Sequence, residues 1–235
     1  MQGTPKMVKD RFVIQASTLI ITVIFVTTAS AELVTFTDRD AFDATGGTSS
    51  VIDFETTALD VVSSGDTISG VTFAYDFGGV SLAVDDQFDT TSGLRYLATD
   101  DGGVLQDGDD LNFSFLPAAG FGLFVVSADP LLDGDVTLTS GLVTAALEAS
   151  SVQQTLADGS SVWFMGLRSD DAETITSVVL ETHGGGGSFL YNVDDVVVVS
   201  AVAVPEPSSI MLLGLVTFAL VRCRFRSSLK QKKDQ

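Results

Sequence analysis

The sequence predicts an all-β fold, a single antiparallel β-sandwich. Between residues 32 and 203, short segments rich in Val, Thr and Phe alternate with clusters of Gly, Asp and Ser, which is typical of strands joined by turns. Residues 112–115 and 136–139 alternate polar and apolar side chains with the period of two expected of half-buried strands. Strands at this spacing, with no helices between them, indicate a sandwich.

The expected strands follow one another along the whole domain. In chain order they are Leu33–Phe36, Val51–Glu55, Val71–Tyr75, Val80–Val84, Leu94–Ala98, Leu111–Leu116, Gly120–Val126, Asp135–Thr139, Leu142–Leu147, Ser151–Leu156, Ser161–Leu167, Thr174–Glu181 and Phe189–Ser200. Val196–Val199 is apolar on both faces, which indicates a central strand. One helix is expected at Asp38–Ala44, with Thr37 as its N-cap. Its Ala41 and Phe42 are expected to pack against one end of the sandwich.

The N-terminal segment, residues 1–31, predicts a signal peptide for the Sec export machinery. Three basic residues precede the apolar run Phe12–Val26, and Ala29 and Ala31 form a small-x-small cleavage site before Glu32. An uncleaved N-terminal membrane helix is the alternative. In either case the domain at residues 32–203 is expected to be exported.

The C-terminal segment, residues 204–235, combines a rigid joint, an apolar run and a basic tail. Pro205 and Pro207 flank Glu206 and cannot extend a sheet, so the folded domain is expected to end there. The apolar run Ile210–Val221 is short for a membrane span, but snorkelling arginines after it extend its reach. Six basic residues follow and are expected to keep the tail cytoplasmic, with the helix anchored in the inner membrane.

The order Pro-Glu-Pro, apolar helix and arginines at the C-terminus resembles the PEP-CTERM sorting signal of Gram-negative bacteria. In that family an exosortase, a membrane cysteine protease, is thought to cut near the Pro-Glu-Pro and pass the protein toward the surface. The resemblance implies exosortase as a partner and a final location at the cell surface or outside the cell. An ordinary C-terminal anchor is the alternative.

The expected domain is strongly acidic and has no cysteine. Residues 32–203 hold 28 acidic side chains against three arginines, a net charge of −25. Such a charge excludes nucleic-acid binding, which depends on Lys and Arg that neutralise phosphates, and it favours solubility and divalent cations. Cys223, the one cysteine, lies in the anchor, so no disulfide can form within the domain and its apolar core must stabilise it.

Two short acidic motifs resemble those of carbohydrate-binding-module jelly rolls. Phe54-Glu55 lies near the start of the domain, and Asp194-Asp195 precedes its last apolar run. In those modules an early Glu and a late Asp meet at a structural Ca²⁺. The resemblance therefore implies a jelly-roll-like sandwich with a calcium site at Glu55, Asp194 and Asp195. The alternative is that these carboxylates cap backbone N–H groups at strand ends.

Other acidic clusters lie in one stretch between strands. Residues 100–103 read Asp-Asp-Gly-Gly and residues 107–110 read Asp-Gly-Asp-Asp. Such loops can supply calcium ligands, but Asp and Gly are also ordinary turn formers, and the spacing is not that of an EF-hand.

The sequence gives no sign of a catalytic site. His183 is the one histidine and is followed by four glycines, so nothing holds it as a general base. We therefore expect no catalytic residues and no enzyme activity. The expected function is that of an exported surface or matrix protein associated with extracellular polysaccharide, a ligand implied by the family resemblance. The alternatives are a carbohydrate-binding module with structural calcium and a carboxylate-dependent glycoside hydrolase.

Overall fold

The fold is an antiparallel β-structure with one short helix. The computed structural model describes residues 32–75, 77–169, 174–182 and 189–200. The helices and strands, in chain order, are β1 (Leu33–Phe36), α1 (Arg39–Ala44), β2 (Ser49–Ile52), β3 (Val61–Val62), β4 (Thr67–Ile68), β5 (Val71–Tyr75), β6 (Leu82–Asp85), β7 (Tyr96–Thr99), β8 (Leu105–Gln106), β9 (Leu111–Ser127), β10 (Val136–Ser140), β11 (Val143–Ala146), β12 (Val152–Thr155), β13 (Ser161–Ser169), β14 (Ile175–Thr182) and β15 (Leu190–Ser200).

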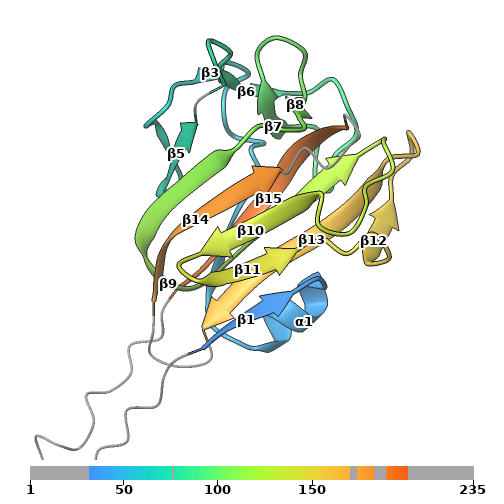
Figure 1. Ribbon diagram of the computed structural model, residues 1–235. Helices are drawn as coiled ribbons and strands as arrows, with labels where there is room; N and C mark the ends of the chain where they lie inside the picture. The colour runs from blue at the N-terminus through green and yellow to red at the C-terminus, as the bar shows by residue number, and fades with distance from the viewer. Residues whose placement is uncertain (1–31, 76, 170–173, 183–188, 201–235) are drawn as a thin grey trace, which may run out of the picture. The chain divides into compact units, whose positions relative to one another are not determined.

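Strand β9 joins the two halves of the structure (Figure 1). Its first part, residues 111–115, pairs with β5 on one side and β14 on the other. Its second part, residues 120–127, pairs with β13 and β15 instead. Pro117 lies between the two parts and has no N–H to donate to a ladder, and the registers with β14 and β15 both shift near it. The sequence predicted two strands here; the prediction of a break was wrong, because the chain continues through the proline as one bent strand.

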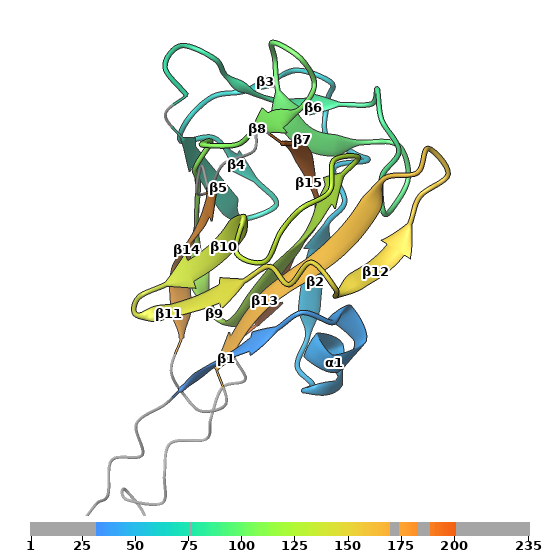
Figure 2. The ribbon, with the colours of Figure 1, turned by 45° about the vertical axis from the view of Figure 1, so that its right-hand side comes forward.

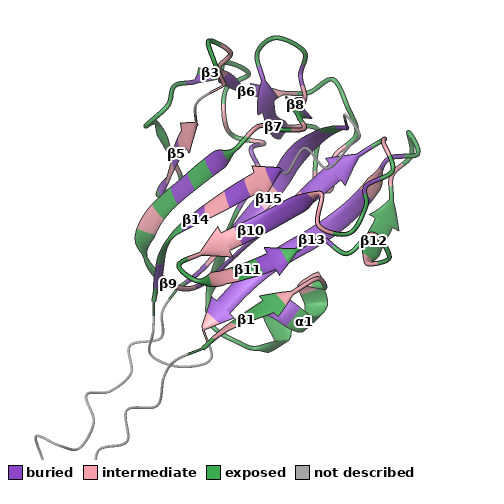
Figure 3. Ribbon diagram, in the orientation of Figure 1, coloured by how far each residue is buried: buried purple, intermediate pink, exposed green. Residues whose placement is uncertain are grey.

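The two halves form facing layers around a common core, which confirms the all-β, sandwich-like class. One layer runs β4-β5-β9-β14-β10-β11, and the other contains β13, β9 and β15 with their neighbours. Strands β10 and β11 contact β13 across the core. The core between the layers includes Phe113, Leu138, Trp163, Met165 and Leu180, all buried. Burial alternates along the first part of β9 and is continuous along β13 (Figure 3).

Strand β15 is central, as the apolar run at its end predicts. It pairs with β9 along one edge and with β2, β7 and β8 along the other. Val196 faces the main core, whereas Val197 and Val199 face a second, smaller core. Both faces of the strand are therefore covered, which is why its side chains are apolar on both sides.

The helix covers the second core beside β1 and β2 (Figure 2). Asp38, not Thr37, is the N-cap: its Oδ1 accepts a hydrogen bond from the N–H of Ala41 at 2.6 Å, three residues on. The Thr37 prediction was wrong by one residue. Phe42 is buried against Phe164, whereas Ala41 is exposed, so only one of the two expected contacts forms.

A buried arginine fixes the helix to β13. Arg168 donates from Nη1 to the carbonyl oxygen of Phe42 at 2.9 Å and from Nη2 to that of Gly46. Its guanidinium also lies over the Phe42 ring, 5.2 Å from the centroid. Burial lowers the pKa of Arg168. The carbonyl groups that end α1 are thereby paired with a cation, which suits the negative end of a helix.

Most other strand boundaries agree with the sequence within a few residues, with one informative exception. Strand β2 ends at Ile52 rather than Glu55, because Phe54 has φ +59° and cannot continue a strand. The two-residue strands β3, β4 and β8 were not predicted, since two residues are too few to show a period.

Candidate functional site

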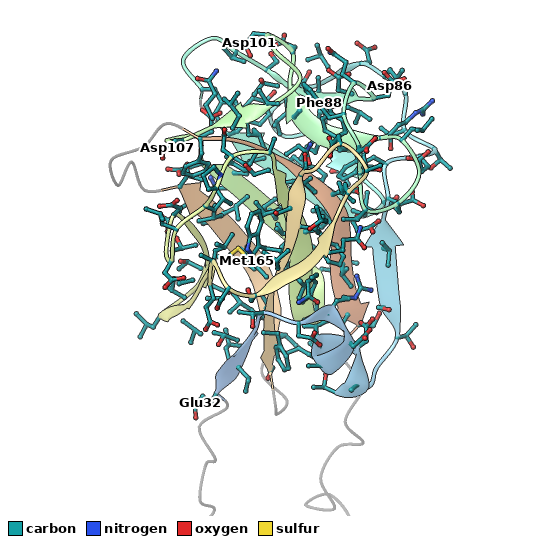
Figure 4. The ribbon with its side chains drawn as sticks, turned by 90° about the vertical axis from the view of Figure 1, so that its right-hand side faces the viewer. Glu32, Asp86, Phe88, Asp101, Asp107 and Met165 are labelled. Carbon is teal, nitrogen blue, oxygen red and sulfur yellow. The ribbon has the colours of Figure 1, made fainter. Side chains whose placement is uncertain are left out.

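Three carboxylates that the sequence groups into one site converge on the 90–95 loop, part of the connection between β6 and β7. Glu55 contacts the loop at Leu94 and Arg95, and Asp194 and Asp195 contact it at residues 91–92. Figure 4 shows that Phe88, in the same connection, lies at the end of the domain far from Glu32.

Glu55 caps one half of this loop. Its Oε1 accepts hydrogen bonds from the N–H groups of Arg95 at 2.6 Å and Leu94 at 2.7 Å. These bonds, that from Arg95 first, lower the pKa of Glu55. Gly93 has φ +62° and lies so close to the carboxylate that a Cβ there would overlap it. The loop therefore folds around the carboxylate.

A β-bulge turns the other two carboxylates toward the same loop. Neighbouring residues of a regular strand point to opposite faces. In β15 the register with β9 shifts between Asp194 and Val197, and Asp195 has φ +45°. As a result both acidic side chains contact Thr91, whose Oγ1 lies 2.6 Å from Asp194 Oδ2 and 2.9 Å from Asp195 Oδ2.

Asp194 is the most buried of the three. Its Oδ2 also accepts from the N–H groups of Thr91 at 2.9 Å and Ser92 at 3.3 Å, and its Oδ1 accepts from the N–H of Asp195 at 2.8 Å. Burial raises the pKa of Asp194 to about 7, opposed by the hydrogen bonds from Thr91 and reinforced by the charge of Asp195. Asp195 in turn accepts a hydrogen bond from Ser92 Oγ at 2.7 Å.

This arrangement does not fit a calcium ion as it stands. Ca²⁺ takes about six to eight oxygen ligands. Glu55 Oε1 and the carboxylate oxygens of Asp194 and Asp195 instead lie within hydrogen-bond distance of N–H or O–H groups, whose hydrogens occupy the space a cation needs. Within the part of the chain that the structure describes, no group of three or more His, Cys, Asp or Glu side chains could hold a metal. The geometry favours the capping alternative, and the calcium site stays a prediction.

Calcium and magnesium are therefore expected to affect stability equally. With the carboxylates committed to the loop, both ions should act only by screening the domain's charge, and the melting temperature should match in the two at equal ionic strength. Thermal melts in Ca²⁺, Mg²⁺ and EDTA with NaCl test this. A rise specific to Ca²⁺, removed by Glu55→Gln, would restore the metal site.

Replacing Gly93 with Ala should destabilise the loop more than its backbone angle alone requires. Any L-residue at φ +62° costs about 1–2 kcal/mol, and at this position the new Cβ also displaces the Glu55 carboxylate. Gly141→Ala is the matched control, because Gly141 has φ +61° and no atom within 4 Å of a new Cβ. Denaturation should show the larger loss for Gly93→Ala; equal losses would mean that Glu55 does not hold the loop.

The remaining acidic clusters behave as turn formers. Asp100 Oδ1 accepts from the N–H of Ser81 at 3.0 Å, and Asp109 Oδ2 accepts from that of Gln106 at 2.7 Å. The two clusters lie on either side of β8 rather than in one continuous loop. Burial raises the pKa of Asp109.

A pocket that the sequence did not predict lies next to the 90–95 loop. Its volume is about 380 Å³, within the range of small-molecule sites. It is formed by the C-terminal end of β9, the N-terminal end of β15, the turn before β13 and the connections between β6 and β7 and between β7 and β8. We call it the Phe88 pocket; its lining residues are Phe88, Val104, Val126, Ser127, Ala128, Asp129, Asp158, Ser160, Leu190, Tyr191 and Asn192.

Hydrogen bonds between these segments hold the pocket open. Asp129 Oδ2 accepts from the N–H of Leu190 at 2.9 Å, and Ser127 Oγ donates to the Leu190 carbonyl at 2.6 Å. The N–H of Asp158 donates to Asp89 Oδ2 at 2.9 Å, which ties the turn to the segment that carries Phe88. The one sequence signal for this site is an aromatic residue, Phe88, inside an otherwise polar turn.

A second pocket, of about 480 Å³, lies between β1, β11 and the turn before β10. It is lined by Thr, Ser, Ala, Gly, one Leu and two acidic residues, and its lining has no aromatic side chain.

The residues of the two terminal segments lie outside the described part of the chain. These include Ala29, Ala31, Pro205, Glu206 and Pro207, together with the predicted signal peptide and anchor helix. Among the residues that the structure describes, no helix is long and apolar enough to cross a membrane.

A protein-family model identifies the sorting signal. Residues 203–226 match the PEP-CTERM protein-sorting motif. The chain carries a PEP-CTERM sorting signal. This match supports an exosortase-sorted protein that is exported with a membrane-anchored sorting segment and ends at the cell surface. The matched residues contain Pro205, Glu206 and Pro207, which confirms the resemblance from which export was expected.

For the folded domain, the similarity to a solved structure is weak. No curated protein matches the sequence. One solved structure, the catalytic domain of a GH87 alpha-1,3-glucanase variant in complex with tetrasaccharides, is 12% identical with a TM-score of 0.29. The match covers 65% of this chain and 31% of that chain, so the chain spans about a third of its length. A similarity at this level supports no argument about activity.

Proposed function

We propose that the protein is a non-catalytic component of the cell surface or extracellular matrix that associates with extracellular polysaccharide. The observation behind this proposal is the PEP-CTERM motif at residues 203–226, because a sorted protein is delivered to the surface. Polysaccharide is the ligand that the resemblance to exosortase-sorted surface proteins implies. The acidic, cysteine-free domain suits such a place, since its charge keeps it soluble outside the cell.

Fractionation of the native host tests this proposal. The wild-type protein should co-sediment with the extracellular matrix and be released when the polysaccharide is degraded. A variant with Pro205→Ala and Pro207→Ala should remain in the membrane fraction, because its sorting motif is lost. Leu142→Ala, a change at a fully exposed turn residue, is the control and should behave as wild type. Wild-type protein found free of matrix would contradict the proposal.

A carboxylate-dependent glycoside hydrolase is the second candidate, because Asp129 and Asp158 line one pocket. Glycosidases use two carboxyl groups that flank the scissile bond. Release of reducing ends from a polysaccharide, abolished by Asp129→Asn or Asp158→Asn, would support hydrolysis over binding. Binding without release would support the non-catalytic proposal.

A further inference from the structure

The rim of the Phe88 pocket is apolar, although the surface around it is acidic. Phe88 and Leu190 line the pocket and leave 44% and 46% of their surface exposed. The Phe88 ring packs against the buried Tyr96 ring, with centroids 6.2 Å apart. Exposed aromatic and aliphatic side chains at a pocket mark a surface that a ligand with an apolar face can cover.

One residue of the pocket wall carries a buried hydrogen-bond acceptor without a donor. Asn192, on β15, is 4% exposed and lines the pocket. Within the described part of the chain, its Oδ1 has no hydrogen-bond partner. A buried acceptor left without a donor is unfavourable, so such a group commonly marks the place where a ligand or water supplies one.

The charged side chains of the pocket are also acceptors. Asp129 and Asp158 line it, and Asp89 contacts the backbone of Asp158. A carboxylate offers about four lone-pair positions, so the single bonds from the Leu190 and Ser160 N–H groups leave capacity for further donors. The same charges repel an anionic ligand. The pocket thus favours a ligand rich in O–H donors and without negative charge.

A neutral sugar has this combination of properties. Its ring C–H groups form an apolar face, and its hydroxyl groups donate hydrogen bonds at the ring edge. We infer that the Phe88 pocket binds a neutral, hydroxyl-rich saccharide unit, stacked on Phe88 with hydroxyl groups donating to the carboxylates of Asp129 and Asp158. This inference rests on the proposed association with polysaccharide and assigns its site and its sugar class.

Affinity electrophoresis of the full chain tests the assignment. The chain is held in a detergent without a sugar headgroup, because a glycosidic headgroup would compete. The probes are soluble neutral polysaccharides (a glucan, a mannan and a galactan) and two polyuronates, polygalacturonate and alginate. We expect retardation by at least one neutral probe and by neither polyuronate.

Three variants locate the binding. Phe88→Ala should weaken binding of the neutral probe by about tenfold or more, because the stacking surface is lost. Phe88→Trp retains an aromatic face and should keep binding within a few-fold of wild type. Leu142→Ala removes a fully exposed apolar side chain away from the pocket and should change nothing. Thermal melts of each variant show that the comparison is between folded proteins.

The possible outcomes distinguish a wrong binding site from a wrong proposal of polysaccharide association. If a neutral polysaccharide binds equally to wild type and Phe88→Ala, the site is wrong while polysaccharide association stands. If only polyuronates bind, the sugar class is wrong. If no polysaccharide binds, the association itself fails, and the site fails with it. Loss in Phe88→Ala, with retention in Phe88→Trp and Leu142→Ala, supports the assignment.

Discussion

Replacing Phe164 with Ala should cost about 3–5 kcal/mol of unfolding free energy, the largest effect expected for a single substitution in this domain. Phe164 is fully buried in the second core, with its ring centroid 5.2 Å from those of Phe42 and Phe124. Phe42 is the buried residue of α1, so the cavity would lie in the packing between the helix and the sheet. Phe88→Ala, at an exposed ring, should cost about 1 kcal/mol or less.

The reason for the size of this effect lies in two glycines. Gly122 on β9 and Gly166 on β13 are directly paired. A Cβ at Gly122 would lie 2.6 Å from Phe164 Cζ, and one at Gly166 would lie 2.9 Å from Phe164 Cε1. The ring therefore occupies space that only glycine leaves open.

A double variant checks this packing directly. Gly122→Ala alone should destabilise by about 1–3 kcal/mol through overpacking. Phe164→Leu removes the ring atom that clashes, so the double variant should recover part of that loss and the two effects should not add. Urea denaturation of the four proteins measures the coupling. Strict additivity would mean that the ring does not rest on Gly122.

The second large effect is the pH dependence that Asp194 imposes. Its pKa is about 7 in the fold, against about 3.9 in an unfolded chain. Between these values the folded state binds the proton and the unfolded state does not, so stability falls as pH rises, on the order of 1.4 kcal/mol per pH unit. The loss should begin near pH 4, end near pH 7 and then level off.

Asp194→Asn isolates this contribution. The amide keeps the shape of the side chain and an acceptor for Thr91, but it cannot titrate. Glu55 acts in the opposite direction, because its lowered pKa gives stability that is lost as pH falls. Unfolding free energies of wild type and Asp194→Asn from pH 4 to pH 8 should therefore converge at low pH and separate toward pH 7. Parallel curves would contradict a buried Asp194 carboxyl with a raised pKa.

The class of fold and most strands follow from local pattern, but their connections do not. Period-two alternation at residues 112–115 gave a correct strand, yet nothing local shows that the chain continues through Pro117 into the second layer. That continuity is set by pairing with β14 and β15, which lie far along the chain. Similarly, Asp38 and Thr37 are both good N-caps by type, and the choice depends on backbone angles.

The candidate sites show the same limit. The sequence grouped Glu55 with Asp194 and Asp195, and they do meet at one loop. At that loop the three carboxylates accept hydrogen bonds from N–H and O–H groups of residues 91–95. The positions of acidic residues in the sequence do not indicate these donors. The Phe88 pocket was missed because its members come from five separate segments and include no motif.

Intact-mass measurement of the surface form from the native host tests the central claim most directly. Exosortase sorting predicts a mature protein that lacks residues 1–31 and most of the sequence after Pro205, because the signal peptide ends at Ala31 and the cut falls near the PEP-CTERM motif. A surface form that retains the full C-terminus to Gln235 would contradict sorting by exosortase.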